Sequence, residues 1–315
     1  MPARHPSNVF AGPYADRASG MRKDAASLDA ALSALESRFV PVWRTQNLIR
    51  RGPTAAAVLL PRTALPELDA REAILLGRFQ GTTTFAVELT AEAPTFPELQ
   101  AEFTDLRLAG GSLPPDEAGL LAYARAMVWW RHRHRHCGVC GAPTVASDAG
   151  HVMTCTRPGC ATEFFPRIDP AIIVLVTDGE RALLGRQAAW PSGRYSTIAG
   201  FVEPGESLED AVVREVREET AVEVLDVEYQ SSQPWPFPSS LMVGFLARAR
   251  DTSVACPDGE LEDARWFTRA QIASGTPKLP PPQSISFRLI AEWYEKGTGR
   301  RLIDEPGAAL WSQRR

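Results

Sequence analysis

The second half of the chain alternates between short apolar runs and two stretches with apolar residues at helical spacing. One helical stretch begins at Ser207, where Asp210 stands in capping-box spacing, and the other covers residues 283–296. Around them lie six runs with the length and composition of strands: 171–177, 181–185, 198–201, 224–229, 241–248 and 264–267. This order predicts a mixed sheet with helices on both faces, which is an α/β sandwich.

The first half of the chain is patterned more weakly. Short apolar runs at 56–60, 74–76 and 85–89 are separated by Gly, Pro and Thr, which predicts strands of a small β-rich domain. Apolar residues at helical spacing over 116–131 predict a linking helix. The first twenty or so residues are rich in Pro, Gly and Ala, and we expect a flexible N-terminus.

Length, charge and apolar runs limit the classes of protein to consider. A chain of 315 residues exceeds the usual size of one domain, so two or three domains are expected. The net charge of -4 gives no general attraction to nucleic acid or to anionic membranes. The apolar runs are too short to cross a bilayer, and the N-terminus lacks the apolar core of a signal peptide. We therefore expect a cytoplasmic protein with no membrane partner.

Four of the five cysteines form two closely spaced pairs, C-x2-C and C-x4-C, separated by fourteen residues. Two such pairs predict a zinc ribbon, because four thiolates complete the tetrahedral shell of Zn²⁺. The predicted ligands are Cys137, Cys140, Cys155 and Cys160. A closed shell leaves no open coordination position, so this zinc would be structural. A disulfide framework is the alternative, and it fits poorly with a chain that shows no export signal.

Residues 200–222 (GFVEPGESLEDAVVREVREETAV) join a Gly-rich turn to a helix dense in glutamate. Glu215, Glu218 and Glu219 can share one helix face, where they repel one another unless a cation lies among them. Carboxylate oxygens suit Mg²⁺ or Mn²⁺, which in turn bind phosphate oxygens. The alternative is a solvated surface helix in which Arg214 pairs with Glu218.

Residues 232–242 read SQPWPFPSSLM, with three prolines alternating with Trp235 and Phe237. This composition predicts a stiff, extended segment that exposes aromatic faces at a low cost in entropy. Such a segment can stack a nucleobase, which is worth about 1–3 kcal/mol per base. The alternative is a proline-rich turn that packs over the core.

The Glu-rich segment resembles the Nudix box, in which Gly, five residues, Glu and seven residues precede Arg-Glu-apolar-x-Glu-Glu-x-Gly-apolar. Its closing glycine is replaced by Ala221, at a cost of about 1 kcal/mol in a left-handed helix cap. The other motifs are FTDLRLAGG, CGVCGAPT, FFPRIDPAIIVLV, SQPWPFPSS and LPPPQSISFRLI. With them the chain is similar to the NADH pyrophosphatase (NudC-like) subfamily of Nudix hydrolases over most of its length beyond the first fifty or so residues.

This resemblance implies metal-dependent hydrolysis of NAD(H) to NMN(H) and AMP, and removal of NAD caps from RNA 5′ ends. It implies catalytic Mg²⁺ or Mn²⁺, structural zinc and a homodimer. It also implies a Nudix α/β/α sandwich preceded by a zinc ribbon and a small β-rich domain. The expected boundaries are a flexible N-terminus at 1–27, the N-terminal domain at 28–131, the ribbon at 132–166 and the Nudix domain at 167–315.

By the same resemblance, Glu215 and Glu219 hold the catalytic metals with Glu260 and the carbonyl of Ala199, and Glu218 acts as a further ligand or as the base. Three box residues have a structural or orienting role: Gly200, Glu206 and Arg214. The implied substrate pocket comprises Phe165, Phe201, Gln233, Pro234, Trp235, Pro236, Phe237, Pro238, Ser239, Ser240, Ser286 and Arg107. Phe165 stands where many members of the family have tyrosine, and Arg107 is implied to contact a phosphate.

Two other functions remain open at this stage. One keeps the Nudix box and changes the substrate to ADP-ribose, a diadenosine polyphosphate or a damaged nucleotide. The other is a zinc-ribbon regulatory protein whose inactive Nudix fold senses a nucleotide. The segment RHRHRH (residues 131–136) is more typical of a solvated helix end than of a metal or nucleic-acid site.

Overall fold

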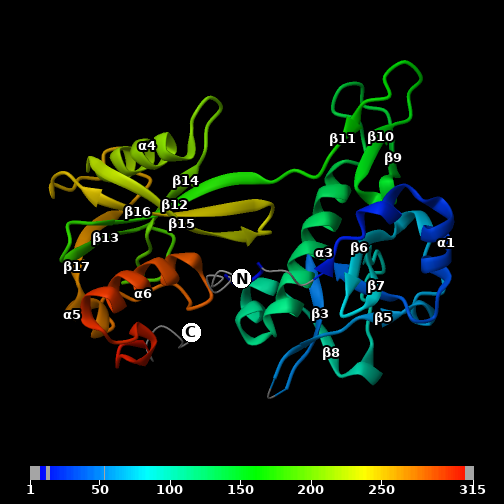
Figure 1. The fold of residues 1–315 in the computed structure, drawn as a ribbon, viewed down its shortest axis with the longest axis horizontal. Helices are drawn as coiled ribbons and strands as arrows, with labels where there is room; N and C mark the ends of the chain where they lie inside the picture. The colour runs from blue at the N-terminus through cyan, green and yellow to red at the C-terminus, as the bar shows by residue number, and fades with distance from the viewer. Residues whose placement is uncertain (1–7, 12–14, 53, 309–315) are drawn as a thin grey trace. The chain divides into compact units, whose positions relative to one another are not determined.

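The computed structural model describes residues 8–11, 15–52 and 54–308. They form two compact units (Figure 1). The first unit runs to Ile168 and also includes Pro234–Ser239, and the second comprises Asp169–Gln233 and the chain from Ser240 onward. The segment 234–239 therefore packs with the N-terminal half, although its neighbours in sequence belong to the second unit.

The second unit is built on a six-stranded mixed sheet in the order β15-β16-β12-β13-β17, with β14 paired to β12. The strands are β12 (Asp169–Thr177), β13 (Arg181–Arg186), β14 (Ile198–Phe201), β15 (Val224–Trp235), β16 (Ser240–Ala249) and β17 (Asp263–Thr268). β12 runs parallel to β16 and antiparallel to β13 and β14. Its residues from Ala171 to Val176 are all buried, which explains their unbroken apolar pattern.

Helices cover both faces of this sheet (Figure 1). α4 (Leu208–Thr220) packs one face through Val212 and Val216, and α6 (Ile285–Thr298) packs the other with the short α5 (Arg269–Ala273). α4 begins with the predicted capping box, in which Ser207 and Asp210 exchange hydrogen bonds with each other's backbone amides. The predicted α/β sandwich is confirmed.

The first unit contains an eight-stranded sheet with the main order β1-β6-β7-β2-β3-β4, while β5 pairs with β2 and β8 with β3. Its strands are β1 (Ala15–Asp16), β2 (Arg38–Trp43), β3 (Gln46–Arg50), β4 (Ala56–Ala57), β5 (Leu60–Pro61), β6 (Ile74–Phe79), β7 (Thr82–Glu88) and β8 (Ala101–Thr104). The unit also contains the helices α1 (Ala25–Ser33), α2 (Leu106–Ala109) and α3 (Pro115–Arg133).

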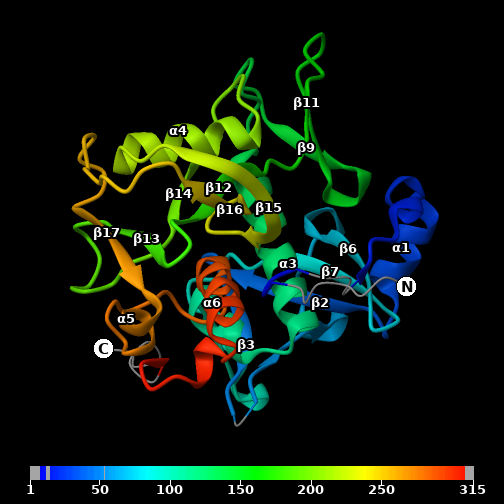
Figure 2. The same cartoon turned by 60° about the vertical axis from the view of Figure 1, so that its left-hand side comes forward.

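α3 packs against the sheet of the first unit (Figure 2). It covers a pair of parallel strands, β2 and β7, just as α6 covers the parallel pair β12 and β16 in the second unit. The two units therefore repeat one local arrangement. No helix in the described part of the chain is both long and apolar enough to cross a membrane.

The N-terminal residues differ from their sequence-based expectation. Phe10 is 2% exposed and belongs to the core under α3, and Ala15–Asp16 pairs with β6. Within residues 1–27, Phe10 and Ala15–Asp16 thus pack on the domain, whereas residues 1–7 and 12–14 lie outside the described residues. The strand β2 was not predicted, because Pro41 interrupts its apolar run and proline is rare inside a strand.

A third, three-stranded sheet follows α3 and has the order β11-β10-β9. Its strands are β9 (Thr144–Ser147), β10 (Val152–Cys155) and β11 (Glu163–Phe164). The two cysteine pairs flank this sheet, in the loop before β9 and around the end of β10. A sheet this small has little apolar core of its own, which fits a ribbon held by a metal.

Candidate active site and zinc site

Arg214 is the centre of a polar network that joins α4 to the loop before it. Its Nη1 lies 2.9 Å from carboxylate oxygens of Glu215 and Glu218. Its Nη2 donates to Glu206 and to the carbonyl of Phe201, also at 2.9 Å. The hydrogen bonds from Arg214 lower the pKa of Glu206 to about 2. Arg214 therefore links the loop to the acidic face of the helix, and its orienting role stays a prediction.

Gly200 in β14 leaves space for the carboxylate of Glu215. A Cβ atom built at position 200 would overlap the carboxyl carbon and both carboxylate oxygens of Glu215. Glu215 is 9% exposed, and burial raises its pKa. The glycine that opens the box is thus required by a close contact and not by a left-handed backbone.

Glu219 is the most deeply buried carboxylate of the box, with 3% of its surface exposed. Burial raises its pKa to about 8, with further contributions from the negative charges of Glu260, Glu215 and Asp258. Among the described residues, no arginine or lysine forms an ion pair with Glu219. A buried carboxylate that has no basic partner of its own and lies near other acidic groups suits a divalent cation bound through oxygen.

Glu260 is brought near Glu219 by a turn after a long loop. Its backbone amide donates to Oδ1 of Asp258 at 3.0 Å, and Gly259 between them has a φ of 74°. Asp258 was not predicted as part of this acidic group, although Asp-Gly before a glutamate is a recognisable turn signal. The carboxylates are grouped more loosely than the cysteines, which alone among the described residues bring three or more ligand atoms within 4.8 Å.

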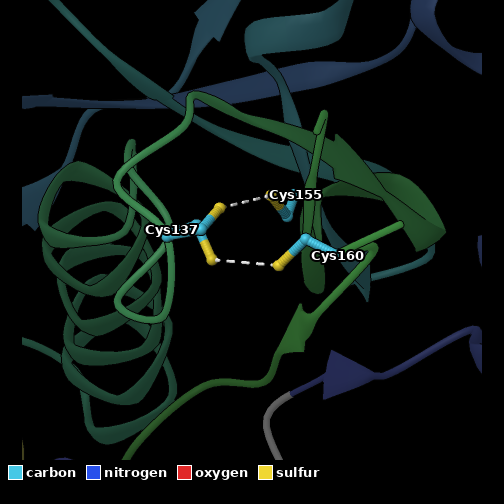
Figure 3. A group of neighbouring side chains, drawn as sticks. Cys137, Cys155 and Cys160 are labelled. Carbon is cyan, nitrogen blue, oxygen red and sulfur yellow. Dashed lines mark hydrogen bonds between the residues drawn. The ribbon is translucent and has the colours of Figure 1, made fainter. Parts of the chain in front are cut away.

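The four predicted zinc ligands converge on one point. All four Sγ atoms lie within 4.8 Å of one another, with Cys137–Cys160 at 3.8 Å and Cys140–Cys155 at 3.5 Å (Figure 3). Zinc–sulfur bonds of about 2.3 Å in a tetrahedron place the sulfurs about 3.8 Å apart. None of these cysteines forms a disulfide. The residues present therefore fit a Cys₄ zinc site.

The two aromatic side chains of SQPWPFPSSLM, Trp235 and Phe237, are half-buried. Trp235 and Phe237 pack on the core under α3, and their ring centroids lie 5.0 Å apart. Phe10 contacts both rings edge-on, at 6.3 and 5.8 Å. For these two side chains the alternative of a turn packed over the core describes the structure better than a freely exposed platform.

Two other predicted pocket residues are buried and already hydrogen-bonded. The side-chain amide of Gln233 donates to the carbonyl of Gln283 and accepts from the amide of Ile285, both at 2.9 Å. The hydroxyl of Ser286 lies 2.9 Å from those of Ser196 and Thr197. These contacts fasten the start of α6 to the sheet, so both residues have a structural role whatever else they contact.

The remaining pocket candidates are divided between the two units. Phe165 and Arg107 belong to the first, and Phe201 and Ser240 to the second. Phe165 is 62% exposed and Phe201 60% exposed, which is unusual for phenylalanine and leaves both rings available to a ligand. Arg107 forms an ion pair with Asp105 at 2.6 Å.

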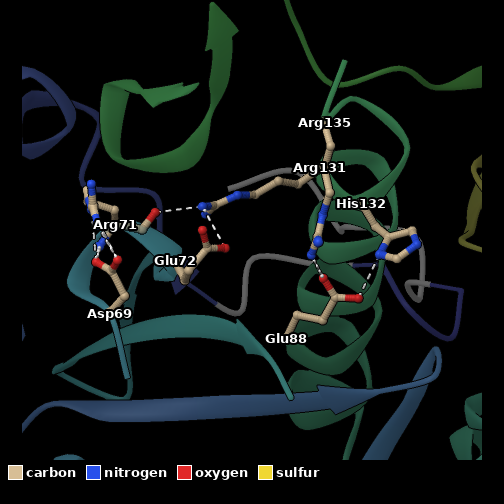
Figure 4. A network of polar contacts seen from close by, with 7 residues as sticks. All are labelled: Asp69, Arg71, Glu72, Glu88, Arg131, His132 and Arg135. Carbon is tan, nitrogen blue, oxygen red and sulfur yellow. Dashed lines mark hydrogen bonds and ion pairs between the residues drawn. The ribbon is translucent and has the colours of Figure 1, made fainter. Parts of the chain in front are cut away.

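The RHRHRH segment is largely occupied by internal contacts (Figure 4). Arg131 pairs with Glu72 at 3.0 Å, whereas His132 and Arg135 share Glu88 at 2.9 and 2.8 Å. His134 contacts the carbonyl of Trp130 at 2.6 Å. The segment is thus at the end of α3, as expected, but it is not simply solvated, because Arg131 is buried and three of its side chains pair with glutamates.

Comparisons with known proteins agree with this geometry. Three family models match successive parts of the chain: an NADH pyrophosphatase-like rudimentary NUDIX domain at 36–130, an NADH pyrophosphatase zinc ribbon domain at 132–165 and a NUDIX domain at 167–289. The "NAD-capped RNA hydrolase NudC" of Stutzerimonas stutzeri (strain A1501) is 40% identical over 247 residues, which are 78% of this chain and 86% of that protein.

Further relatives differ in how much of their length is shared. The "NAD-capped RNA hydrolase NudC" of Mycobacterium bovis (strain BCG / Pasteur 1173P2) is 40% identical over 297 residues, covering 88% of this chain and 91% of that protein. The "NAD-capped RNA hydrolase NUDT12" of Macaca fascicularis is 43% identical over 196 residues, 58% of this chain. The chain spans only 42% of the length of this last relative.

Proposed function

The chain belongs to the NudC family of Nudix hydrolases, and from this premise we propose that it hydrolyses the pyrophosphate bond of NAD(H) to NMN(H) and AMP. The same reaction at an RNA 5′ end removes an NAD cap, the activity named for its relatives. The observation that carries the proposal is Glu219, a buried carboxylate that faces other acidic groups and has no basic partner among the described residues.

The acidic groups of the second unit would hold Mg²⁺ or Mn²⁺. The proposed ligands are Glu215, Glu219 and Glu260, the carbonyl of Ala199, and Glu218 as a further ligand or as the base. When bound, the cation offsets the charge of the pyrophosphate and lowers the pKa of a bound water. Because Arg214 holds Glu215 and Glu218 through one guanidinium, these carboxylates keep a fixed orientation toward the reacting phosphate.

We assign the dinucleotide pocket to the residues that the resemblance implies. Phe165 and Phe201 would flank the bases, residues 233–240 and Ser286 would line the pocket, and Arg107 would contact a phosphate. The exposure of Phe165 also suits a contact with a second copy of the chain, in keeping with a homodimer. We place the protein in the cytoplasm, where NAD(H) and RNA are available and reduced cysteines keep zinc.

Product analysis tests this function. Purified protein with NADH and Mg²⁺ or Mn²⁺ is expected to give NMNH and AMP by mass spectrometry. Glu219→Gln is expected to lower kcat by at least about 100-fold while thermal stability is retained, because it removes a metal ligand. Glu209→Gln is the matched control, since Glu209 is an exposed glutamate of the same helix.

Two outcomes would contradict the proposal. Normal turnover by Glu219→Gln would exclude this metal cluster. Failure of the folded, zinc-loaded wild type to cleave NADH or NAD-capped RNA, while it cleaves ADP-ribose or a diadenosine polyphosphate, would change the substrate and keep the Nudix chemistry. Failure on the whole panel would favour a nucleotide-sensing role.

A further inference from the structure

Two arginines of the first unit lie over the ring of Phe237. The guanidinium carbon of Arg125, on α3, is 4.7 Å from the centroid of the Phe237 ring, and that of Arg107 is 5.5 Å away. The ring edges of Phe10 and Trp235 pack against the same phenylalanine. The tip of the segment that the family resemblance assigns to substrate is thus held by residues from distant parts of the N-terminal domain.

Arg125 is the less usual of the two arginines because it is only 7% exposed. Its Nε donates to the carbonyl of Thr45 at 2.9 Å, and its Nη1 has no hydrogen-bond partner among the described residues. Burial lowers the pKa of Arg125 to about 10, so the side chain is still charged at neutral pH. A buried cation with so few acceptors is costly to keep, and the face of an aromatic ring is one of the groups that can stabilise it.

The hydrogen bond to Thr45 fixes Arg125 on its other side. Arg44 and Thr45 form the turn between β2 and β3 with φ values of 47° and 64°. A β-branched residue rarely adopts this left-handed conformation, so the turn has one well-defined geometry imposed by its strands. Arg125 therefore connects a fixed turn of the sheet to the ring of Phe237.

We propose that Arg125 is a positioning residue for substrate binding: it holds Phe237, and with it the segment Pro234–Ser239, in the conformation that receives the dinucleotide. This inference rests on the proposed function, because it assigns the segment to the substrate pocket. It goes further in making the rudimentary N-terminal domain a part of the binding machinery. Arg125 itself needs no contact with substrate or metal.

Steady-state kinetics with NADH tests this role. Arg125→Ala is expected to raise KM about tenfold and to change kcat less than about twofold, because a desolvated cation–π contact is lost away from the reacting phosphates. Arg125→Lys keeps the charge without the planar guanidinium, and its KM is expected to lie between those of the wild type and Arg125→Ala.

Arg131→Ala is the matched control for loss of a buried arginine. Arg131 is also on α3 and 8% exposed, with an unpartnered Nη1, but it contacts Glu72 and the carbonyl of Arg71 and not the 234–239 segment. The variant Arg131→Ala is expected to lower the melting temperature, as Arg125→Ala does, and to leave KM within about twofold of the wild type. Equal KM values for Arg125→Ala and Arg131→Ala would overturn the proposal.

Hydrogen–deuterium exchange gives a readout that does not depend on activity. Peptides covering residues 230–242 are expected to exchange faster in Arg125→Ala, or in Arg125→Lys if the alanine variant does not fold, and at the wild-type rate in Arg131→Ala. If the wild type does not cleave NADH, the proposed function fails, and faster exchange still shows that Arg125 holds the segment. Exchange at the wild-type rate in the folded Arg125 variant would refute the positioning role.

Discussion

At the scale of single residues, the chemistry of the site depends on close approach and on burial. The carboxylate of Glu215 lies where a side chain at position 200 would be, so only glycine fits there. Glu219 is buried among other negatively charged groups. Such an arrangement is unfavourable for folding by itself, since buried carboxylates repel one another and lose hydration. Unfavourable burial of charge is typical of carboxylates that bind a cation or take part in a reaction.

Replacing Gly200 tests how closely Glu215 must approach β14. Gly200→Ala is expected to lower kcat for NADH by about 100-fold or more, because the added methyl group displaces the carboxylate of Glu215. Gly20→Ala is the control, since a Cβ there meets nothing within 4 Å. Full activity of Gly200→Ala would mean that the observed position of Glu215 is not needed for catalysis.

At the scale of elements, α4 shows how local signals and a local exception combine. The capping box defines its start, and its end is at Ala221, which has a φ of 59° and a ψ of 4°. The helix therefore ends in the left-handed conformation that glycine usually adopts at this position, and here alanine adopts it. The helix keeps its geometry because Val216 and Val222 are fully buried on either side of this end.

The energetic cost of this cap can be measured. Ala221→Gly is expected to raise the free energy of unfolding by about 1 kcal/mol, because glycine adopts positive φ without steric strain. Ala211→Gly in the same helix is expected to lower it by about 1 kcal/mol or more, since Ala211 is helical and fully buried. Chemical denaturation of both variants measures the two effects, and a shift of the same sign would contradict the explanation.

At the scale of the whole molecule, the chain joins two units that repeat one arrangement of parallel strands and a covering helix, and the ribbon forms the last part of Met1–Ile168 in the first unit. The cores of the two units are separate clusters, and the ribbon adds Met153 to the core of the first unit. Because the ribbon's own sheet is small, we expect its four cysteines to contribute much of its stability. The segment 234–239 is the part of the second half that packs with the first unit.

Removing one zinc ligand tests the structural role of the ribbon. The wild type is expected to bind one zinc per chain, and Cys160→Ser is expected to lose it and to unfold at a lower temperature. Cys256→Ser is the matched control, because Cys256 packs at the edge of the second unit's core and not in the four-cysteine group. Zinc content by elemental analysis decides the question, and a zinc-free wild type purified without chelator would contradict the assignment.

Particular residues show how far the sequence predicts the fold and the site. The strands of the second unit, α3, α4 and α6 follow from apolar periodicity, and the zinc ligands follow from spacing, because these signals lie within a few turns or one loop. β2 was missed because Pro41 lies inside it, and a proline normally argues against a strand. Asp258 and Phe10 were missed because neither residue has a local pattern that indicates its distant partners.

The Nudix box, the cysteine pairs and the Trp-Phe segment can be recognised from residue types and spacing alone, and they indicate the chemistry of the chain without a fold. The surroundings of those residues become visible in the folded chain. In the folded chain Glu219 is buried near Glu260, and the ring of Phe237 contacts the guanidinium of Arg125. Gln233 and Ser286 form buried hydrogen bonds. Burial and contact between residues distant in sequence arise because whole helices and strands pack together. Spacing along the chain indicates only the interactions that are possible between neighbouring residues.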